Sequence, residues 1–416
     1  MRSFVYVLSA AVFAVGCSDP NSTAVDDAGV DADARADASS RCARGQAPSR
    51  WIAPDAGASE GGLPSLPLVQ TQGAGVLASP TFVGVTFDGD DQRAPLEDFL
   101  ATVGCTPYWR EIADDYGVGD GIAGVPIHVS TAAPAATDAT QIRAFVKGLA
   151  QADTDNGAAT DRVYVVFYPA TTKITYQGVQ SCLSFRGYHD TVKVGSTDVA
   201  YAVLARCQPS LATLTSVTSH ELVEAATDPL PLTGYGTLSD LDLAWGIFGG
   251  AEVADLCDFG KAQSLAPPGF AYTVQRSWSN RAAFERRDPC VPAVGKSFFV
   301  AAPSVSDLVP FTKGLTTTMT RGLKLAVGQS RTIDVVLTAT SPVADWKVTA
   351  SDLSPSLGAS PALELSLDAS TGNAGKTLHL TVKRLGSEPN SGVAPFLLLS
   401  EAPDGEQHGW LAVVGD

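Results

Sequence analysis

The chain has 416 residues, of which 45% are hydrophobic and 17% charged, a composition typical of globular proteins and not of disordered ones. This length exceeds one ordinary domain and predicts two folded domains with additional leader sequence. The formal net charge of -16, without any cluster of Lys and Arg residues, excludes a nucleic-acid-binding protein.

The first 17 residues have the features of a bacterial lipoprotein signal peptide. A basic start is followed by a short apolar run at residues 4–15 and by small residues just before Cys17. A run this short is typical of a signal peptide and not of a membrane span. Residues 14–17 resemble a lipobox, so we expect export, lipidation of Cys17 and anchoring at the outer membrane or cell surface. Because Ala14 stands where Leu is commoner, ordinary signal cleavage nearby is the alternative.

Residues 18–62 are rich in Asp, Ala and Ser and contain few large apolar side chains. Such a segment cannot bury enough apolar surface to order itself. We therefore expect a disordered acidic linker between the lipid anchor and the folded part of the chain.

Six cysteines follow Cys17, and an even number in an exported chain predicts disulfide bonds. Several pairings are open, and we expect Cys182 to pair with Cys207 and Cys257 with Cys290. Cys-x-x-Cys spacing is absent, which disfavours a thiolate zinc site. The six are Cys42, Cys105, Cys182, Cys207, Cys257 and Cys290.

Residues 63–295 show the mixture of strand and helix patterns typical of an α+β domain. Runs rich in β-branched and aromatic residues predict strands at 81–87, 162–168 and 198–206, the last two buried inside a sheet. Apolar residues at helical spacing predict helices, which we place at 96–103, 107–116 and 137–150.

Residues 217–229 carry the most informative motif of the chain. His220 is followed directly by Glu221, and Glu224 lies four positions after the histidine. In a helix His220 and Glu224 share one face, and Pro229 ends such a helix near Asp228. Zincins bind zinc through two side chains at this spacing, and the Glu between them acts as general base.

The motif predicts zinc ligands at His220 and Glu224 and a general base at Glu221. The usual motif is His-Glu-x-x-His, and here a glutamate replaces the second histidine. The alternative is a buried amphipathic helix whose His and Glu side chains hydrogen-bond each other.

Two other segments offer a further ligand. Glu252 and Asp255 follow downstream at helical spacing, where some zincins supply a glutamate ligand and an acidic residue that orients the site. A solvated acidic helix start would look the same. Upstream, His189 lies beside Asp190 in a predicted loop, next to a predicted disulfide. It offers either a ligand or a hydrogen-bond donor to the transition state.

These segments recur in an order that resembles the secreted bacterial proteins related to the plant exordium (phosphate-induced) family. The resemblance covers roughly residues 78–292 and implies an extracellular, zincin-like domain. It rests on Tyr108-Trp109 leading to residues 116–119, and on residues 182–189, 219–229, 252–257 and 274–280.

Residues 296–416 consist of short alternating runs separated by Gly, Ser, Asp and Pro turns. This spacing predicts an antiparallel β-sandwich of immunoglobulin-like type, a spacer or adhesion module that folds without cysteines. The runs lie at 322–340, 346–350, 363–367, 376–383 and 395–400.

The predicted fold is therefore an α+β zincin-like domain followed by an all-β immunoglobulin-like sandwich. The function we expect is a surface-anchored, zinc-dependent, metallopeptidase-like hydrolase of peptides or proteins that uses a metal-activated water. The first alternative is a non-catalytic extracellular binding or adhesion lipoprotein with a structural or vestigial metal site. A weaker alternative is polysaccharide binding, suggested by Tyr188, Trp245 and Trp278.

Overall fold

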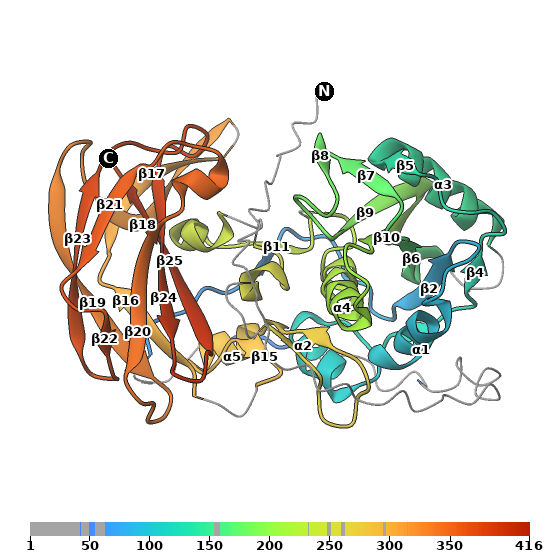
Figure 1. Cartoon of the computed structure of the whole chain (residues 1–416), viewed down its shortest axis with the longest axis horizontal. Helices are drawn as coiled ribbons and strands as arrows, with labels where there is room; N and C mark the ends of the chain where they lie inside the picture. The colour runs from blue at the N-terminus through green and yellow to red at the C-terminus, as the bar shows by residue number, and fades with distance from the viewer. Residues whose placement is uncertain are drawn as a thin grey trace.

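The computed structural model describes residue 42 and residues 50–54, 63–153, 159–231, 233–247, 251–258, 263–293, 297–313 and 315–416. The expected signal peptide at 1–17, with Cys17, and most of the expected linker at 18–62 lie outside these residues. The described chain forms a body that contains helices and, after residue 297, a body built of strands (Figure 1). None of the described helices combines the length and apolarity that a membrane crossing needs.

A mixed sheet forms the centre of the first body. β9 lies antiparallel at one edge beside β10, and β3 and β4 pair with β2 at the other. The three long strands β2, β6 and β10 are parallel, and their predicted positions are confirmed to within one residue. The strand bounds are β2 (Thr81–Thr86), β3 (Ile122–Ala123), β4 (Ile127–His128), β6 (Arg162–Tyr168), β9 (Gly187–Val194) and β10 (Thr197–Ala205).

Helices cover both faces of this sheet. Every residue of β6 is buried, and alternate residues enter two separate cores: Val163 and Val165 on the face of α1, α2 and α4, Tyr164 and Val166 on the face of α3. This pattern is expected of a strand with both faces covered. The helices are α1 (Arg93–Val103), α2 (Pro107–Tyr116), α3 (Ala139–Ala152) and α4 (Leu211–Thr227).

The motif helix α4 is longer than its predicted span. It begins at Leu211, and Ser210 caps its N-terminus: the side chain of Ser210 accepts a hydrogen bond from the backbone N–H of Thr213 at 3.2 Å. Threonine-rich sequence here has low helix propensity, which hides the first turn from a pattern search. The helix ends at Thr227, as predicted, because Pro229 disfavours helical dihedrals at Asp228.

Short elements connect these parts. The helical ones are η3 (Ala159–Asp161), η4 (Asp240–Gly246), η5 (Asp255–Cys257) and α5 (Asn280–Phe284). The strands are β1 (Gln70–Thr71), β5 (Ala136–Asp138), β7 (Lys173–Tyr176), β8 (Val179–Gln180), β11 (Tyr235–Thr237), β12 (Ser264–Leu265), β13 (Val274–Gln275), β14 (Ser277–Trp278) and β15 (Cys290–Val291).

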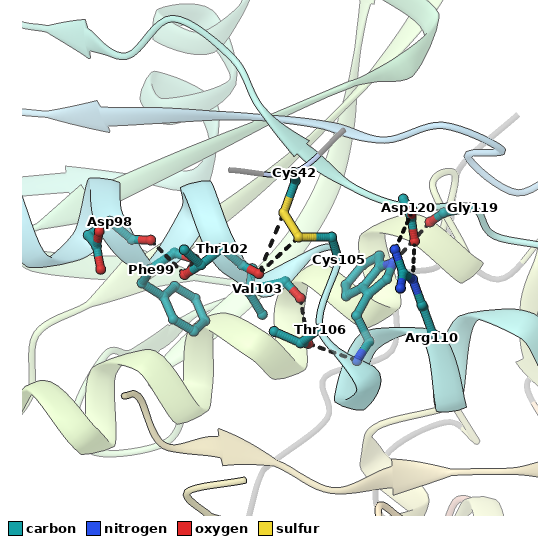
Figure 2. The surroundings of a disulfide bond; sticks show 11 residues. Cys42, Asp98, Phe99, Thr102, Val103, Cys105, Thr106, Arg110, Gly119 and Asp120 are labelled. Carbon is teal, nitrogen blue, oxygen red and sulfur yellow. Dashed lines mark hydrogen bonds and ion pairs between the residues drawn. A yellow bond between two sulfur atoms is a disulfide. The ribbon is translucent and has the colours of Figure 1, made fainter. Parts of the chain in front are cut away.

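Three disulfide bonds cross-link the first body, and both predicted pairs, Cys182–Cys207 and Cys257–Cys290, are confirmed. The third joins Cys42 to Cys105 in the loop between α1 and α2. Figure 2 shows both of its sulfur atoms beside the carbonyl oxygen of Thr102, at 3.6 and 3.7 Å. Cys42 belongs to the segment expected to be a linker, so this residue is tied to the folded body. Such bonds are typical of proteins that fold in an oxidising compartment.

The second body consists of two sheets packed face to face (Figure 1). One has the order β16-β19-β23-β21 and the other β17-β18-β25-β24-β20-β22. The long predicted run at 322–340 is divided between β18 and β19, and β16, β17 and β25 escaped the sequence patterns. The strands are β16 (Phe299–Pro303), β17 (Asp307–Lys313), β18 (Thr316–Lys324), β19 (Ser330–Ala339), β20 (Trp346–Asp352), β21 (Leu363–Leu367), β22 (Thr371–Gly372), β23 (Thr377–Arg384), β24 (Ala394–Glu401) and β25 (Gln407–Gly415), with η6 (Ser354–Leu357) between them.

The two bodies share apolar packing. Trp245 of η4 makes ring contacts with Trp410 of the sandwich at 5.1 Å and with Trp278 of the first body at 5.8 Å. All three are buried, and Trp278 is 1% exposed. Tyr188 is buried as well, so the aromatic side chains that suggested polysaccharide binding are core residues.

Candidate metal centre

The helix α4 brings together the first two predicted ligands. Nε2 of His220 lies 3.1 Å from Oε2 of Glu224, one turn further along the helix, as the i, i+4 spacing predicts. Glu224 is buried, whereas the His220 side chain remains 14% exposed. This end of the pair is therefore within reach of solvent.

The edge strand β9 supplies the second histidine of the centre. His189 pairs with Ala202 of β10, and its side chain lies on the sheet face that α4 covers. Nδ1 of His189 is 3.8 Å from Oε2 of Glu221 and 3.6 Å from Oε2 of Glu224. The sequence placed His189 in a loop, whereas the structure places it in a strand, whose pleat directs the imidazole toward α4.

A glycine makes this approach of strand and helix possible. A Cβ atom on Gly187 would lie 2.5 Å from Oε1 of Glu221. Gly187 and His189 are two positions apart in β9, so both face α4. The missing side chain at 187 leaves the space that the Glu221 carboxylate occupies.

The segment 251–258 contacts α4 through Asp255. The backbone N–H of Asp255 donates to Oε1 of Glu224 at 3.2 Å, and Oδ1 of Asp255 lies 3.5 Å from Nε2 of His220. The N–H of Trp278 and the side-chain amide of Gln275 donate to carbonyls of this segment at 2.8 and 3.1 Å, and the Cys257–Cys290 disulfide ties the segment to β15. These bonds hold the segment against the helix.

Glu252, predicted as a further ligand, falls in a donor group with His189 and not in the one that contains His220. Its Oε1 lies 3.6 Å from Nε2 of His189. Glu252 belongs to a turn that precedes η5, not to a helix with Asp255, so the two carboxylates diverge toward different histidines. Asp255, predicted to orient the site, is the acidic residue beside His220.

One member of the cluster was missed as a candidate ligand. Asp228 follows the last residue of α4, and its Oδ1 accepts hydrogen bonds from the N–H groups of Thr233 at 3.1 Å and Gly234 at 2.6 Å. Its carboxylate lies near His189 and Glu252. The sequence signal was Pro229, which indicates that the chain leaves the helix at this residue, but not the direction it takes.

Among the residues that the structure describes, the donor atoms form three groups with the residue types of metal sites, and the atoms of each group lie within 4.8 Å of one another. The first is His220, Glu224 and Asp255. The second is His189, Asp228 and Glu252, and the third combines His189 with Glu221 and Glu224.

The electrostatics of the centre are those of a buried cluster with an excess of carboxylates. Burial raises the pKa of Glu252 to about 8, and the charge of Glu224 adds to this effect. The pKa of Glu224 itself is lowered to about 2, because the two histidines outweigh the effect of burial. Burial favours the neutral imidazole at His189 and His220, but the surrounding carboxylates raise the pKa of both well above the usual value. The imidazoles thus partly neutralise the carboxylates.

Comparisons with known proteins do not assign a family. No protein-family model and no curated protein matches the chain. A conjugative transposon lipoprotein from Bacteroides eggerthii is 11% identical, with a TM-score of 0.18, over 28% of this chain and 97% of that one. The twitchin kinase region from C. elegans is 15% identical, with a TM-score of 0.17, over 29% of this chain and 16% of that one. Scores this low carry no conclusion about fold or function.

Proposed function

We propose that this chain is a surface-anchored, zinc-dependent peptide hydrolase whose metal is held by His220, Glu224 and Asp255. The observation that carries the proposal is the spacing of the donor atoms. In a tetrahedral zinc site with bonds of about 2.0–2.2 Å, neighbouring donors lie about 3.3 Å apart. The distances from Nε2 of His220 to Glu224 and Asp255 are 3.1 and 3.5 Å.

Zinc held there would supply Lewis acidity and lower the pKa of a bound water toward neutrality. Glu221, next to His220 on α4, would act as the general base that accepts a proton from the attacking water and gives it to the leaving amine. Burial raises the pKa of Glu221, while His189 opposes the shift. A carboxylate with a raised pKa is a stronger base than an ordinary glutamate.

The architecture supports the same proposal. A sheet with parallel central strands, an antiparallel edge strand β9 and the motif helix packed beside it is the arrangement expected of a zincin-like domain. Two packed sheets of mainly antiparallel strands support an immunoglobulin-like type for the second body. Anchoring through Cys17 and membership of the exordium-related proteins belong to the proposal, and the three disulfides support an extracellular location.

The second candidate is a non-catalytic surface protein with a structural ion. It is favoured by the burial of the side chains of Glu221 and Glu224, which are 5% and 3% exposed. Structural zinc sites are closed, whereas catalytic sites keep one position open to water. Activity therefore decides between the two candidates.

Metal removal tests the proposal directly. The exported chain, loaded with zinc, is expected to cleave members of a mixed peptide library, to lose this activity on chelation and to regain it when zinc returns. Metal content is measured in parallel by elemental analysis. Stoichiometric zinc without cleavage would support the structural-ion candidate, and a chain that binds no zinc would exclude the zinc-dependent hydrolase.

Gly187→Ala tests the position of the general base. The new Cβ would overlap the Glu221 carboxylate, whose end atoms must then move away. We expect kcat to fall by about tenfold to 100-fold, since misplacement of a catalytic group by about 1 Å has effects of this size. The control is Gly148→Ala in α3, where a Cβ meets no atom within 4 Å. Equal activities of the two variants would contradict the assigned position.

A further inference from the structure

Two of the three donor groups have no residue in common. His220, Glu224 and Asp255 form one set, and His189, Asp228 and Glu252 form the other, here called the inner set. The inner set is the more buried at its histidine, whose side chain is 4% exposed. A single ion held by the first set leaves all three inner residues unused.

The inner set contains a buried polar atom that lacks a hydrogen bond. Within the described part of the chain, Nε2 of His189 has no hydrogen-bond partner, although its side chain is more than nine-tenths buried. It is directed at Oε1 of Glu252, at 3.6 Å, beyond hydrogen-bond distance but close to the separation of two ligands of one ion. Leaving a buried polar atom without a partner costs free energy, which a bound cation would recover.

Charge also favours a second cation. The two sets and Glu221 place five carboxyl groups beside two imidazoles, so acidic side chains outnumber basic ones in the centre. For the four carboxylates other than Asp228, every ion pair in the described residues is with one of these histidines. Buried charges in proteins are normally paired or coordinate metals.

Backbone hydrogen bonds hold the carboxylate of Asp228, and a glycine leaves room beside both inner carboxylates. The N–H groups of Thr233 and Gly234 fix Oδ1 of Asp228. A Cβ on Gly236 would lie 2.7 Å from Oδ2 of Asp228 and 3.6 Å from Cγ of Glu252. The absence of a side chain at 236 thus leaves space beside both carboxylates.

We propose that His189, Asp228 and Glu252 bind a second divalent metal ion, so that the chain holds two ions in adjoining sites. This proposal deepens the proposed hydrolase and takes from it the assignment of the first ion to His220, Glu224 and Asp255. The sites adjoin because Nδ1 of His189 is 3.6 Å from Oε2 of Glu224. One imidazole with two carboxylates suits zinc rather than calcium or magnesium. Two-metal sites occur in hydrolases, aminopeptidases among them, where they stabilise the charge that develops in the transition state.

Zinc stoichiometry of the exported chain tests the second site. After loading with Zn²⁺ and dialysis, elemental analysis is expected to give two zinc ions per chain. His189→Ala and Glu252→Gln should each keep one ion, His220→Ala should also keep one, and His189→Ala combined with His220→Ala should keep none. His379→Ala, at an exposed histidine of β23, is the control and should keep both. The Kd of the lost site should rise at least tenfold.

One zinc ion in the wild type would overturn the second site, and so would loss of both ions from a Glu252→Gln chain that melts like the wild type. The Gln variant keeps the shape of Glu252, so a folding failure of His189→Ala does not affect this test. Two ions without peptide cleavage would reject the proposed hydrolase but support the second site. One ion together with peptide cleavage would reject the second site but support the proposed hydrolase.

Discussion

Glu221→Gln is expected to lower kcat/KM for peptide cleavage by at least about 100-fold while leaving bound zinc unchanged. The amide has nearly the shape of the carboxylate but cannot accept the proton of the attacking water. Glu221 is not among the three residues proposed to hold the first ion, so zinc content should stay at the wild-type value. Cleavage rates at low substrate concentration and elemental analysis on the same sample measure both quantities.

The matched control is Glu364→Gln on β21, an exposed glutamate paired with Lys383 at 2.8 Å in the other body. It makes the same chemical change far from the centre and should leave kcat/KM unchanged. Wild-type activity in Glu221→Gln would show that another group takes the proton. Loss of zinc in this variant would instead make Glu221 a ligand, as the group of His189, Glu221 and Glu224 allows.

Trp278→Ala is expected to destabilise the first body by about 3–5 kcal/mol, among the largest effects of any single substitution in this chain. Trp278 is 1% exposed and packs against Trp245. Its backbone N–H donates to the carbonyl of Val253, in the segment that carries Glu252 and Asp255, at 2.8 Å. Its carbonyl accepts a hydrogen bond from the Tyr116 hydroxyl of α2 at 2.8 Å. The cavity that Trp278→Ala leaves should therefore loosen the segment that carries Glu252 and Asp255.

The measurement is the melting temperature, which should fall by about 10 °C. Trp278→Phe keeps most of the ring volume but loses the hydrogen bond from Nε1 to Pro67, at 3.2 Å, and should cost about 1–3 kcal/mol. Leu315→Ala, at a side chain that is 97% exposed, should leave melting unchanged. A Trp278→Ala chain that melts like Leu315→Ala would contradict the packing described for this residue.

The parts of the centre predictable from sequence are those set by local spacing. His220 and Glu224 meet because an α-helix places residues four apart on one face, and the helix stops where Pro229 requires it. Cys182–Cys207 and Cys257–Cys290 were predictable as pairs. The buried strands β6 and β10 were visible because runs of Val, Tyr and Ala match strands covered on both faces.

The parts that escaped prediction depend on contacts between distant segments. The backbone of segment 251–258 decides whether Glu252 or Asp255 lies beside His220. Gln275 of β13 and Trp278 of β14 hold this segment by hydrogen bonds. Asp228 enters the inner set because the chain after Pro229 folds back over it. No spacing rule relates residues that meet only through such long-range contacts.

The sequence by itself determined the three long strands of the first sheet, the end of the motif helix, two of the disulfide pairs and six candidate side chains of the centre: His189, His220, Glu221, Glu224, Glu252 and Asp255. Only the tertiary structure decided how the acidic residues divide between the two histidines. The physical reason is that local rules act along one helix or strand, whereas Glu252 meets His189 and Asp255 meets His220 through contacts between segments far apart in the sequence.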